Sequence, residues 1–264
     1  MFSLIVVNHN TAELASQCLA SIFDHFSEGD FEVILVDNAS TDNSVAKLTK
    51  EFGQRIKLIT QPVNNGFASA NNLGAREARG EYLFFLNSDT LVKKDILKPL
   101  KTVLNSDTTI GIMAPRLLTG ESKEQPFAHG SFPKLSNLIW GKIIGPIVAS
   151  SGRQIAEVDW VSGAALIIRK EVLKLSGGWD EKYFMYFEDV DLCWQAKKNG
   201  YSVAVLDTVN LIHLGGRSWQ YNYTKKEKYY QSQAYFFRKN YGFWPALILK
   251  LIRWPYKTWI WLNN

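Results

Sequence analysis

Three clusters of acidic and amide side chains lie directly after apolar runs of this sequence, at residues 37–42, 87–89 and 188–191. An apolar run that ends abruptly in polar residues is typical of a buried strand, and open α/β sheets bind ligands at the carboxyl ends of their strands. Carboxylates placed there can hold Mg²⁺ or Mn²⁺ against the phosphates of a substrate. A further carboxylate, kept away from the metal, can act as a general base toward a hydroxyl.

Each cluster taken alone also has a purely structural interpretation. Residues 37–40 can form an Asx turn with a helix cap, and Asp89 can cap the helix that follows it. Acidic residues at 188–191 favour a helix N-terminus. A lone histidine such as His213 is more often a surface or core residue than a ligand. The combination and order of the clusters is what favours a site.

The elements that position these clusters alternate between strand-sized and helix-sized segments in the first third of the chain. We expect strands at residues 3–7, 31–36, 56–60 and 81–86, with helices between them. This alternation predicts a parallel, doubly wound sheet with helices on both faces. The first turn after a strand has no G-x-G-x-x-G sequence, which argues against a dinucleotide-binding domain.

The pattern weakens after residue 89. We expect helices at residues 91–104, 170–175, 189–198 and 225–240, and strands at residues 110–115, 158–169 and 202–206, with His213 in a loop. Residues 119–155 are rich in Gly, Ser, Pro and Lys and are interpreted as a long excursion, with an apolar patch at residues 138–144. Long excursions of this kind in compact domains are usually functional or disordered.

Composition limits the class of protein. The 264 residues, of which 46% are hydrophobic and 21% charged, suit a large α/β domain. The net charge of +5 is compatible with nucleic acid, an anionic membrane surface or an anionic substrate. Cys18 and Cys193 match no metal or redox spacing and fit a reduced cytoplasmic compartment. The N-terminus resembles a first strand more than a signal peptide, and no apolar run is long enough to predict a membrane-spanning helix.

The C-terminal segment, residues 243–262, is aromatic, basic and amphipathic. Its basic residues Lys250, Arg253 and Lys257 cluster within roughly 60° of arc, opposite Trp244 and Leu251. This pattern predicts a helix that lies in a membrane interface, broken or kinked at residue 255, a proline. The protein would then be peripheral on the inner face of the cytoplasmic membrane. The alternative is a helix docked on the domain.

The order and type of these motifs resemble the family-2 glycosyltransferases with the GT-A fold, over roughly residues 2–220, and most closely their bacterial rhamnosyltransferase-like branch. Residues 34–42 are similar to the family's VDNxSxD segment, in which the first Asp, here Asp37, accepts the N3–H of uracil or thymine. Residues 64–72 resemble the NxG…N loop near the base and diphosphate, although many members have Arg where this chain has Asn71. Residues 87–89 stand at the DxD position, with Asn87 replacing the first acid. The nucleotide-sugar site that this resemblance implies contains Asn8, Asp37, Asn64, Gly66, Asn72, Asn87, Ser88 and Asp89.

Later motifs extend the resemblance to the catalytic half. Residues 160–164 are similar to the W-x-x-G-A segment beside the donor sugar and acceptor, and Asp189 falls in the ED motif as the catalytic base, with Asp191 as its rival. His213 stands where a late histidine joins Asp89 in holding the metal. The donor-sugar and acceptor site implied here contains Trp160, Gly163, Glu188 and Asp191.

The resemblance implies an α/β protein with a mostly parallel, Rossmann-like GT-A domain at residues 1–220 and a C-terminal helical segment at residues 221–264. Residues 1–115 would be the nucleotide-binding half and residues 116–220 the acceptor and catalytic half. The implied activity is a metal-dependent, inverting transfer from a nucleotide-sugar to a hydroxyl of a saccharide or lipid-linked saccharide, in cell-wall or surface-polysaccharide synthesis. It favours dTDP-rhamnose as donor over a UDP-sugar and implies no nucleic-acid partner.

Two other classes stay open at this point. A nucleotidyltransferase is also α/β and metal-dependent, but it usually has a glycine- and lysine-rich phosphate loop early in the chain, and this sequence has none. A non-catalytic nucleotide-sugar-binding module could be built on the same fold.

Overall fold

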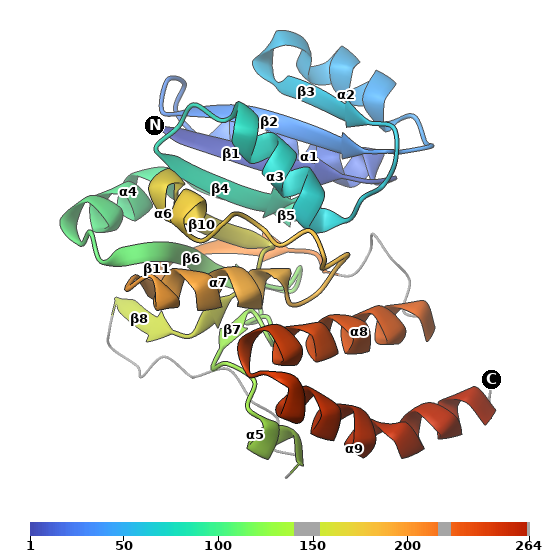
Figure 1. Cartoon of the computed structure of the whole chain (residues 1–264). Helices are drawn as coiled ribbons and strands as arrows, with labels where there is room; N and C mark the ends of the chain where they lie inside the picture. Colours follow the sequence, from blue (N-terminus) through green and yellow to red (C-terminus); the bar gives the residue numbers. More distant parts are fainter. Residues whose placement is uncertain (140–153, 216–222, 263–264) are drawn as a thin grey trace.

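The computed structural model describes residues 1–139, 154–215 and 223–262 (Figure 1). Its centre is a mixed sheet with the strand order β3-β2-β1-β4-β10-β6-β11-β5, and β8 pairs with β11 beside this path. Strands β7 and β9 form a second, small sheet. The apolar patch expected at residues 138–144 lies almost entirely outside the described residues.

The N-terminal half follows the predicted β-α alternation. The strands β3, β2, β1 and β4 are all parallel, with Asn8 aligned to Asp37 and Val7 aligned to Asn87. The polar residues that follow the apolar runs therefore meet at one edge, as predicted. The elements are β1 (Phe2–Asn8), α1 (Ala12–His25), β2 (Phe31–Asn38), α2 (Ser44–Phe52), a 3-10 turn (Gly53–Arg55), β3 (Lys57–Gln61), α3 (Phe67–Glu77) and β4 (Tyr82–Asn87).

The second half continues the same sheet with reversed strands. Strand β10 runs antiparallel to both β4 and β6, whereas β11 is parallel to β6. The elements are β5 (Thr90–Leu91), α4 (Leu97–Ser106), β6 (Ile110–Leu118), β7 (His129–Gly130), α5 (Leu135–Ile139), β8 (Ile155–Val158), β9 (Trp160–Val161), β10 (Ala165–Arg169), α6 (Lys170–Leu175), α7 (Glu188–Lys198) and β11 (Ser202–His213).

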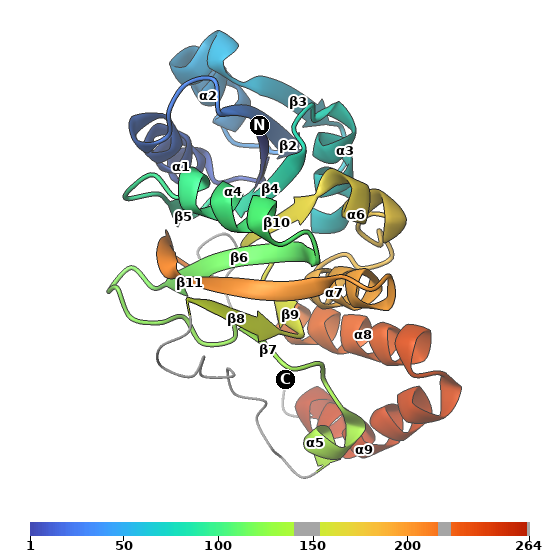
Figure 2. The same cartoon turned by 90° about the vertical axis from the view of Figure 1, so that its left-hand side faces the viewer.

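Helices cover both faces of the sheet, as Figure 2 shows from a second direction. Successive strand residues point to opposite faces: Leu4 and Val6 pack with α1, α2 and α4, whereas Ile5 packs with α3, α6 and α7. Both faces of each central strand are thus buried, which explains why these strands read as continuous apolar runs.

Two sequence expectations are wrong in position. The helix expected at residues 91–104 begins only at Leu97, because Thr90–Leu91 form β5 and the Asp95 carboxylate accepts a hydrogen bond from the Leu97 amide (2.9 Å). His213 lies in a strand instead of a loop, because β11 extends beyond residue 206 to pair with β5, opposite Thr90. Both errors come from a strand pairing between distant residues, which local sequence patterns do not reveal.

Two C-terminal helices, α8 (Tyr223–Asn240) and α9 (Phe243–Leu262), complete the described chain. They enclose a third apolar cluster, in which Phe236, Phe237 and Leu249 pack against Phe187 and Val190. Helix α9 continues past residue 255, so a break at that proline is wrong; a helix can continue when only one backbone bond is lost there. None of the helices in the described part of the chain is long and apolar enough to cross a membrane.

Candidate active site

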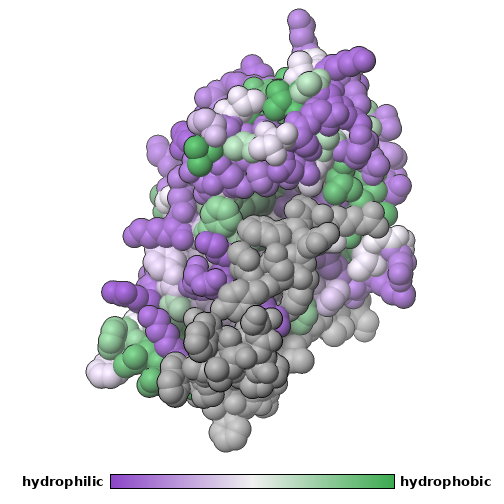
Figure 3. Space-filling model, turned by 90° about the vertical axis from the view of Figure 1, so that its right-hand side faces the viewer, coloured by the Kyte–Doolittle hydropathy of each residue, from purple (hydrophilic) through white to green (hydrophobic). Residues whose placement is uncertain are grey.

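The carboxyl ends of β1, β2 and β4 meet at one edge of the sheet, on the right-hand side of Figure 1. Figure 3 looks onto this side, where hydrophilic residues dominate the upper part of the molecule. Asn8, Asp37 and Asn87 are the last or next-to-last residues of their strands. The structure therefore brings these three predicted residues together at one sheet edge, and their role in binding stays a prediction.

The Asp37 carboxylate is fixed by hydrogen bonds from both neighbouring segments. Its Oδ1 accepts from the Ser40 amide (2.9 Å), and its Oδ2 accepts from Asn8 Nδ2 (2.8 Å). Asn8 is held in turn by the Thr11 hydroxyl (2.7 Å), which lies 2.9 Å from the Ser88 hydroxyl. Each carboxylate oxygen keeps acceptor capacity for a further donor. Sequence reasoning did not include Thr11 in the site. Its contact with Ser88, a residue 77 positions away, cannot be seen in the sequence.

The loop before α3 is clamped from two sides. Asn64 Oδ1 accepts from the Gly66 amide (3.0 Å) and from Asn38 Nδ2 (2.9 Å), which ties the loop to the end of β2. Gly66 has φ +90°, and a Cβ there would lie 2.5 Å from the Phe184 carbonyl oxygen. Only glycine fits this backbone conformation and this close approach. Asn38 was missed as a site residue, although it stands beside Asp37 in the motif.

Asn72 does not join the group around Asp37. Both atoms of its amide bind the backbone of Trp179, with the Nδ2 donating to the carbonyl (2.8 Å) and the Oδ1 accepting from the amide (2.9 Å). Its Nδ2 also donates to Glu181 (2.8 Å). Asn72 thus attaches the segment before α7 to helix α3 of the N-terminal half, and its contact with a nucleotide stays a prediction.

Asp89 and His213 lie together, as the sequence predicted for metal ligands. His213 Nε2 is 3.1 Å from Asp89 Oδ1 and 3.3 Å from Asn87 Nδ2. On its other side, His213 Nδ1 is 2.8 Å from Gln125 Oε1, so the ring donates this proton to the amide oxygen. The Nε2 atom then faces the carboxylate, where it could bind a cation together with Asp89 when it carries no proton. Gln125 carried no sequence signal, because it lies in the excursion after β6.

These two side chains fit a divalent metal in separation and in type. Two ligands that bind an octahedral cation at about 2.1 Å and about 90° to each other are about 3 Å apart, close to the separation of His213 Nε2 and Asp89 Oδ1 (3.1 Å). No group of three or more His, Cys, Asp or Glu side chains with this potential occurs within the described residues. A site with two protein ligands leaves positions for water and substrate phosphates, as Mg²⁺ sites usually do.

The N-terminal turn of α7 carries the candidate base. Asp189 accepts hydrogen bonds from the backbone amides of Gly163 (Oδ2, 2.9 Å) and Val190 (Oδ1, 2.8 Å). Burial raises the pKa of Asp189 although these bonds oppose it, and a raised pKa makes a carboxylate a stronger base. Burial and the Asp189 charge raise the pKa of Glu188 well above its usual range, and Glu188 Oε2 has no hydrogen-bond partner among the described residues.

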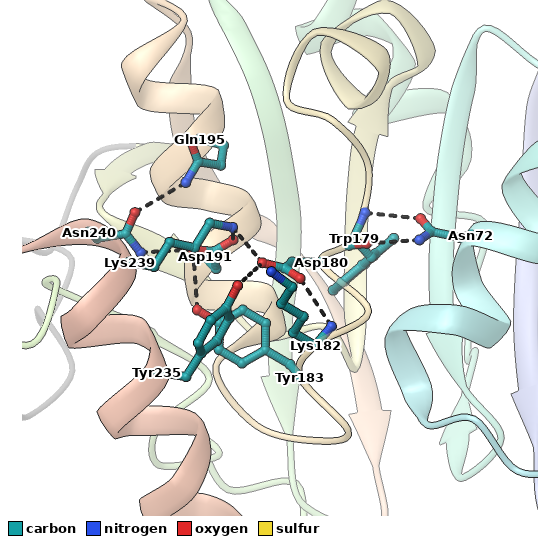
Figure 4. Close-up of polar contacts among 10 residues, drawn as sticks. All are labelled: Asn72, Trp179, Asp180, Lys182, Tyr183, Asp191, Gln195, Tyr235, Lys239 and Asn240. Atoms are coloured by element: carbon teal, nitrogen blue, oxygen red, sulfur yellow. Dashed lines mark hydrogen bonds and ion pairs between the residues drawn. The ribbon is translucent and has the colours of Figure 1, made fainter. Parts of the chain in front are cut away.

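Asp191, the rival base, is occupied by other groups. Its carboxylate is 2.6 Å from Lys239 Nζ and accepts from Asn240 Nδ2 (2.8 Å) and the Tyr183 hydroxyl (3.3 Å), as Figure 4 shows. The side chain is only 2% exposed. A buried carboxylate that is paired with an ammonium group is poorly suited to take a proton from a substrate, so the geometry favours Asp189.

The segment at residues 160–164 lies between α3 and the first turn of α7, which carries Asp189. A Cβ on Gly163 would lie 3.2 Å from the Phe67 ring, 3.3 Å from Trp179 and 3.5 Å from Asp189 Cβ, so this position has no room for a side chain without rearrangement. Trp160 is partly buried and donates from its Nε1 to the Ser131 carbonyl oxygen (3.1 Å). The structure thus brings Gly163 against Asp189, and it orients Trp160 through the 129–132 segment.

A sequence profile described as "Glycosyl transferase family 2" matches residues 3–160, more than half of the chain. The chain belongs to glycosyl transferase family 2. The rhamnosyltransferase WbbL of Escherichia coli is 26% identical to this family-2 chain over 226 residues, which cover 81% of this chain and 83% of WbbL. The low-salt glycan biosynthesis hexosyltransferase Agl10 of Haloferax volcanii is 26% identical over 218 residues, which cover 80% of this chain and 66% of Agl10.

Solved structures confirm the GT-A fold of this glycosyltransferase. The mannosyltransferase PcManGT of Pyrobaculum calidifontis, in complex with GDP-Man and Mn²⁺, matches with a TM-score of 0.65 and 19% identity, over 90% of this chain and 63% of PcManGT. GalNAc-T7 with UDP, GalNAc and Mn²⁺ matches with a TM-score of 0.67 and 16% identity, over 90% of this chain and 49% of that chain. The chain thus spans less than two thirds of each of these two proteins.

Proposed function

We propose that this family-2 glycosyltransferase moves a sugar, L-rhamnose from dTDP-rhamnose, to a hydroxyl of a saccharide or lipid-linked saccharide in cell-wall or surface-polysaccharide synthesis. The observation that carries the proposal is the presence at one sheet edge of a cation-compatible pair, Asp89 and His213, and a partly buried carboxylate of raised pKa, Asp189. The likeness to a rhamnosyltransferase at 26% identity supports the choice of sugar. A UDP-sugar is the competing donor.

The donor would bind along the carboxyl edge of β1, β2 and β4. Asp37, already oriented by Asn8 and Ser40, accepts the N3–H of the pyrimidine. The clamped loop with Asn64 and Gly66 would border the base and diphosphate, together with the polar residues of the 87–89 turn, Asn87 and Ser88. The prior fixation of these groups reduces the entropy that donor binding would cost.

Asp89 and His213 would hold Mg²⁺ or Mn²⁺. When bound, such an ion neutralises the negative charge of a nucleoside diphosphate leaving group. Gln125 keeps the imidazole ring oriented by accepting its Nδ1 proton.

Asp189 would act as the base of an inverting reaction. Its carboxylate takes the proton of an acceptor hydroxyl, the hydroxyl oxygen attacks the anomeric carbon, and the nucleoside diphosphate departs from the opposite face with the electrons of the broken glycosidic bond. Glu188 stands beside Asp189, and its buried Oε2, which has no hydrogen-bond partner among the described residues, would accept from a sugar hydroxyl only after neighbouring side chains move. Trp160 belongs to the same segment as Gly163 and would place its aromatic ring against the sugar.

The C-terminal helix would bring the site to a membrane surface. Large apolar side chains of α9 are exposed, including Trp244 at 70% and Leu251 at 64%, with Lys250 and Arg253 on the same helix. In Figure 3, hydrophobic residues also gather low on the molecule, at the level of the C-terminal helices. An amphipathic helix of this composition binds at a lipid interface. The side chains of residues 254–262, including Lys257, lie outside the described residues.

Saturation-transfer NMR with a panel of donors tests the proposal. The protein is mixed with dTDP-rhamnose, a UDP-hexose or GDP-mannose, each with and without Mn²⁺, and release of the nucleoside diphosphate is then followed after a saccharide acceptor is added. We expect metal-dependent binding of dTDP-rhamnose and its consumption. Preferred consumption of a UDP-sugar contradicts the choice of donor. Binding without consumption on any acceptor supports a non-catalytic module instead.

A further inference from the structure

Two acidic side chains near the candidate base share one cation. Lys239 Nζ, on α8, lies 2.6 Å from Asp191 Oδ2 and 2.7 Å from Asp180 Oδ2. Figure 4 shows the lysine reaching from its helix to a point between the two carboxylates. Asp191 and Asp180 are 2% and 18% exposed at their side chains, and Lys239 is 29% exposed.

Neutral groups of α8 and α7 complete this cluster. The Tyr235 hydroxyl donates to Asp180 (2.9 Å), and Asn240 Nδ2 donates to Asp191 (2.8 Å). Gln195 Nε2, on α7, donates to the Asn240 side-chain oxygen (3.2 Å). Burial opposes the charged forms, but the hydrogen bonds and charges of the cluster outweigh it, so the pKa of Asp180 is lowered and the pKa of Lys239 is raised.

The two carboxylates belong to segments that build the site. Asp191 stands two residues after Asp189, in the same first turn of α7. Asp180 follows Trp179, whose backbone is held by Asn72 of α3 and whose ring packs on Phe67. Lys239 therefore links α8 to the first turn of α7, which carries the base. It also links α8 to the segment at residues 179–180, which Asn72 attaches to α3.

We propose that Lys239 is a positioning residue of the transfer reaction: by pairing with Asp191 and Asp180 it holds the first turn of α7, and so Asp189, in its working place. This makes α8 part of the catalytic unit and extends that unit beyond residue 220. The inference rests on the proposed function, because Asp189 is taken as the base. It assigns to a C-terminal helix a role in the chemical step in addition to any contact with a membrane.

The physical reason is the charge balance of the cluster. Without the ammonium group, two carboxylates that now share one cation repel each other, and Asp191 is left as a buried charge without a counter-ion. The first turn of α7 and the segment around Asp180 then move apart, or water enters between them. A displacement of about 1 Å at a reacting group costs roughly a hundredfold in rate. The donor groups around Asp37 and Asp89 lie on other elements and keep their contacts.

The experiment compares Lys239→Met with Arg238→Met, an exposed neighbour on the same helix that serves as the matched control. We expect Lys239→Met to lower kcat by roughly a hundredfold while the Kd for the donor stays within about twofold of the wild-type value. Amide hydrogen exchange in residues 180–193 should become faster in Lys239→Met and stay unchanged in Arg238→Met. A purely structural role would change unfolding without this split between kcat and donor affinity.

A second variant keeps the test decisive if Lys239→Met fails to fold. Lys239→Arg keeps a cation between Asp191 and Asp180, so it should fold and retain most of kcat and the slow exchange. Equal kcat and exchange in wild type and Lys239→Met would overturn the inference, as would a Lys239→Arg variant no better than Lys239→Met. Failure of the proposed function is distinct, because the wild-type protein would then transfer no sugar while the exchange difference persisted.

Discussion

His213 Nε2 faces Asp89 Oδ1 at 3.1 Å, although the two residues are 124 positions apart in the chain. The antiparallel pairing of β11 with β5 sets this distance, since it places His213 opposite Thr90. The pair is held by backbone structure before any ligand arrives. A bound octahedral metal would therefore find two of its six ligands already in place, and phosphate and water oxygens would supply the others.

Loss of the Asp89 carboxylate should remove the metal dependence of donor binding. We expect Asp89→Ala to weaken donor binding in the presence of Mn²⁺ by at least about tenfold, and to leave the weaker binding in a chelator unchanged. Isothermal titration with the donor, with and without Mn²⁺, measures this directly. Asp24→Ala, an exposed carboxylate on α1, is the matched control. Equal metal dependence in both variants would remove Asp89 from the metal site.

Gln125 should affect the metal without touching it. Its Oε1 accepts the Nδ1 proton of His213, which fixes the ring with Nε2 toward Asp89. We expect Gln125→Ala to lower Mn²⁺ affinity by about 10- to 100-fold, as loss of such supporting groups usually does. Electron paramagnetic resonance of free Mn²⁺ in a titration gives the affinity. Unchanged affinity would mean that His213 does not need this support or is not a ligand.

The ionised Glu188 side chain should lower the free energy of unfolding at neutral pH. Its pKa is raised in the folded protein by burial and by the Asp189 charge, so folding is favoured most below the unfolded pKa and this stability is lost as pH rises through the folded pKa. We therefore expect Glu188→Gln to raise the free energy of unfolding by about 1–3 kcal/mol at pH 8, and by much less near pH 4. Urea unfolding at both pH values measures it. A variant that is less stable at pH 8 contradicts the assignment of an unfavourable buried charge.

The exposed apolar residues of α9 should bind lipid. We expect Trp244→Ser/Leu251→Ser to reduce sedimentation with anionic vesicles at least severalfold, because both side chains are exposed on this helix. The control is Leu175→Ser, which removes an equally exposed apolar side chain from α6. If the control loses as much binding as the double variant, or if neither differs from wild type, α9 is not the contact.

The fold of the N-terminal half could be predicted because its signals are local. Apolar strands that end in Asn8, Asp37 and Asn87 identify a parallel sheet and its ligand edge from sequence alone. The second half could not be read in this way: β10 enters between β4 and β6 in the reverse direction, and nothing in its apolar sequence encodes that direction.

Candidate site residues were predictable where a motif surrounded them. Asp89 and His213 were predicted as metal ligands and Asp189 as the base, and the structure places Asp89 beside His213; the three roles stay predictions. Gln125 and Lys239 were not found, because each acts through a hydrogen bond or ion pair to a residue 88 or 48 positions away. A long-range polar contact of this kind leaves no periodicity or spacing in the sequence.

The central claim is that Asp189 serves as the base in a sugar transfer whose metal is held by Asp89 and His213. The most direct test is the rate of nucleoside diphosphate release from dTDP-rhamnose with acceptor and Mn²⁺, measured for wild type and Asp189→Asn alongside donor binding by NMR. The account predicts a loss of about 10²- to 10⁴-fold in kcat with donor binding retained. Full turnover by Asp189→Asn, or loss of donor binding in step with the rate, would contradict it.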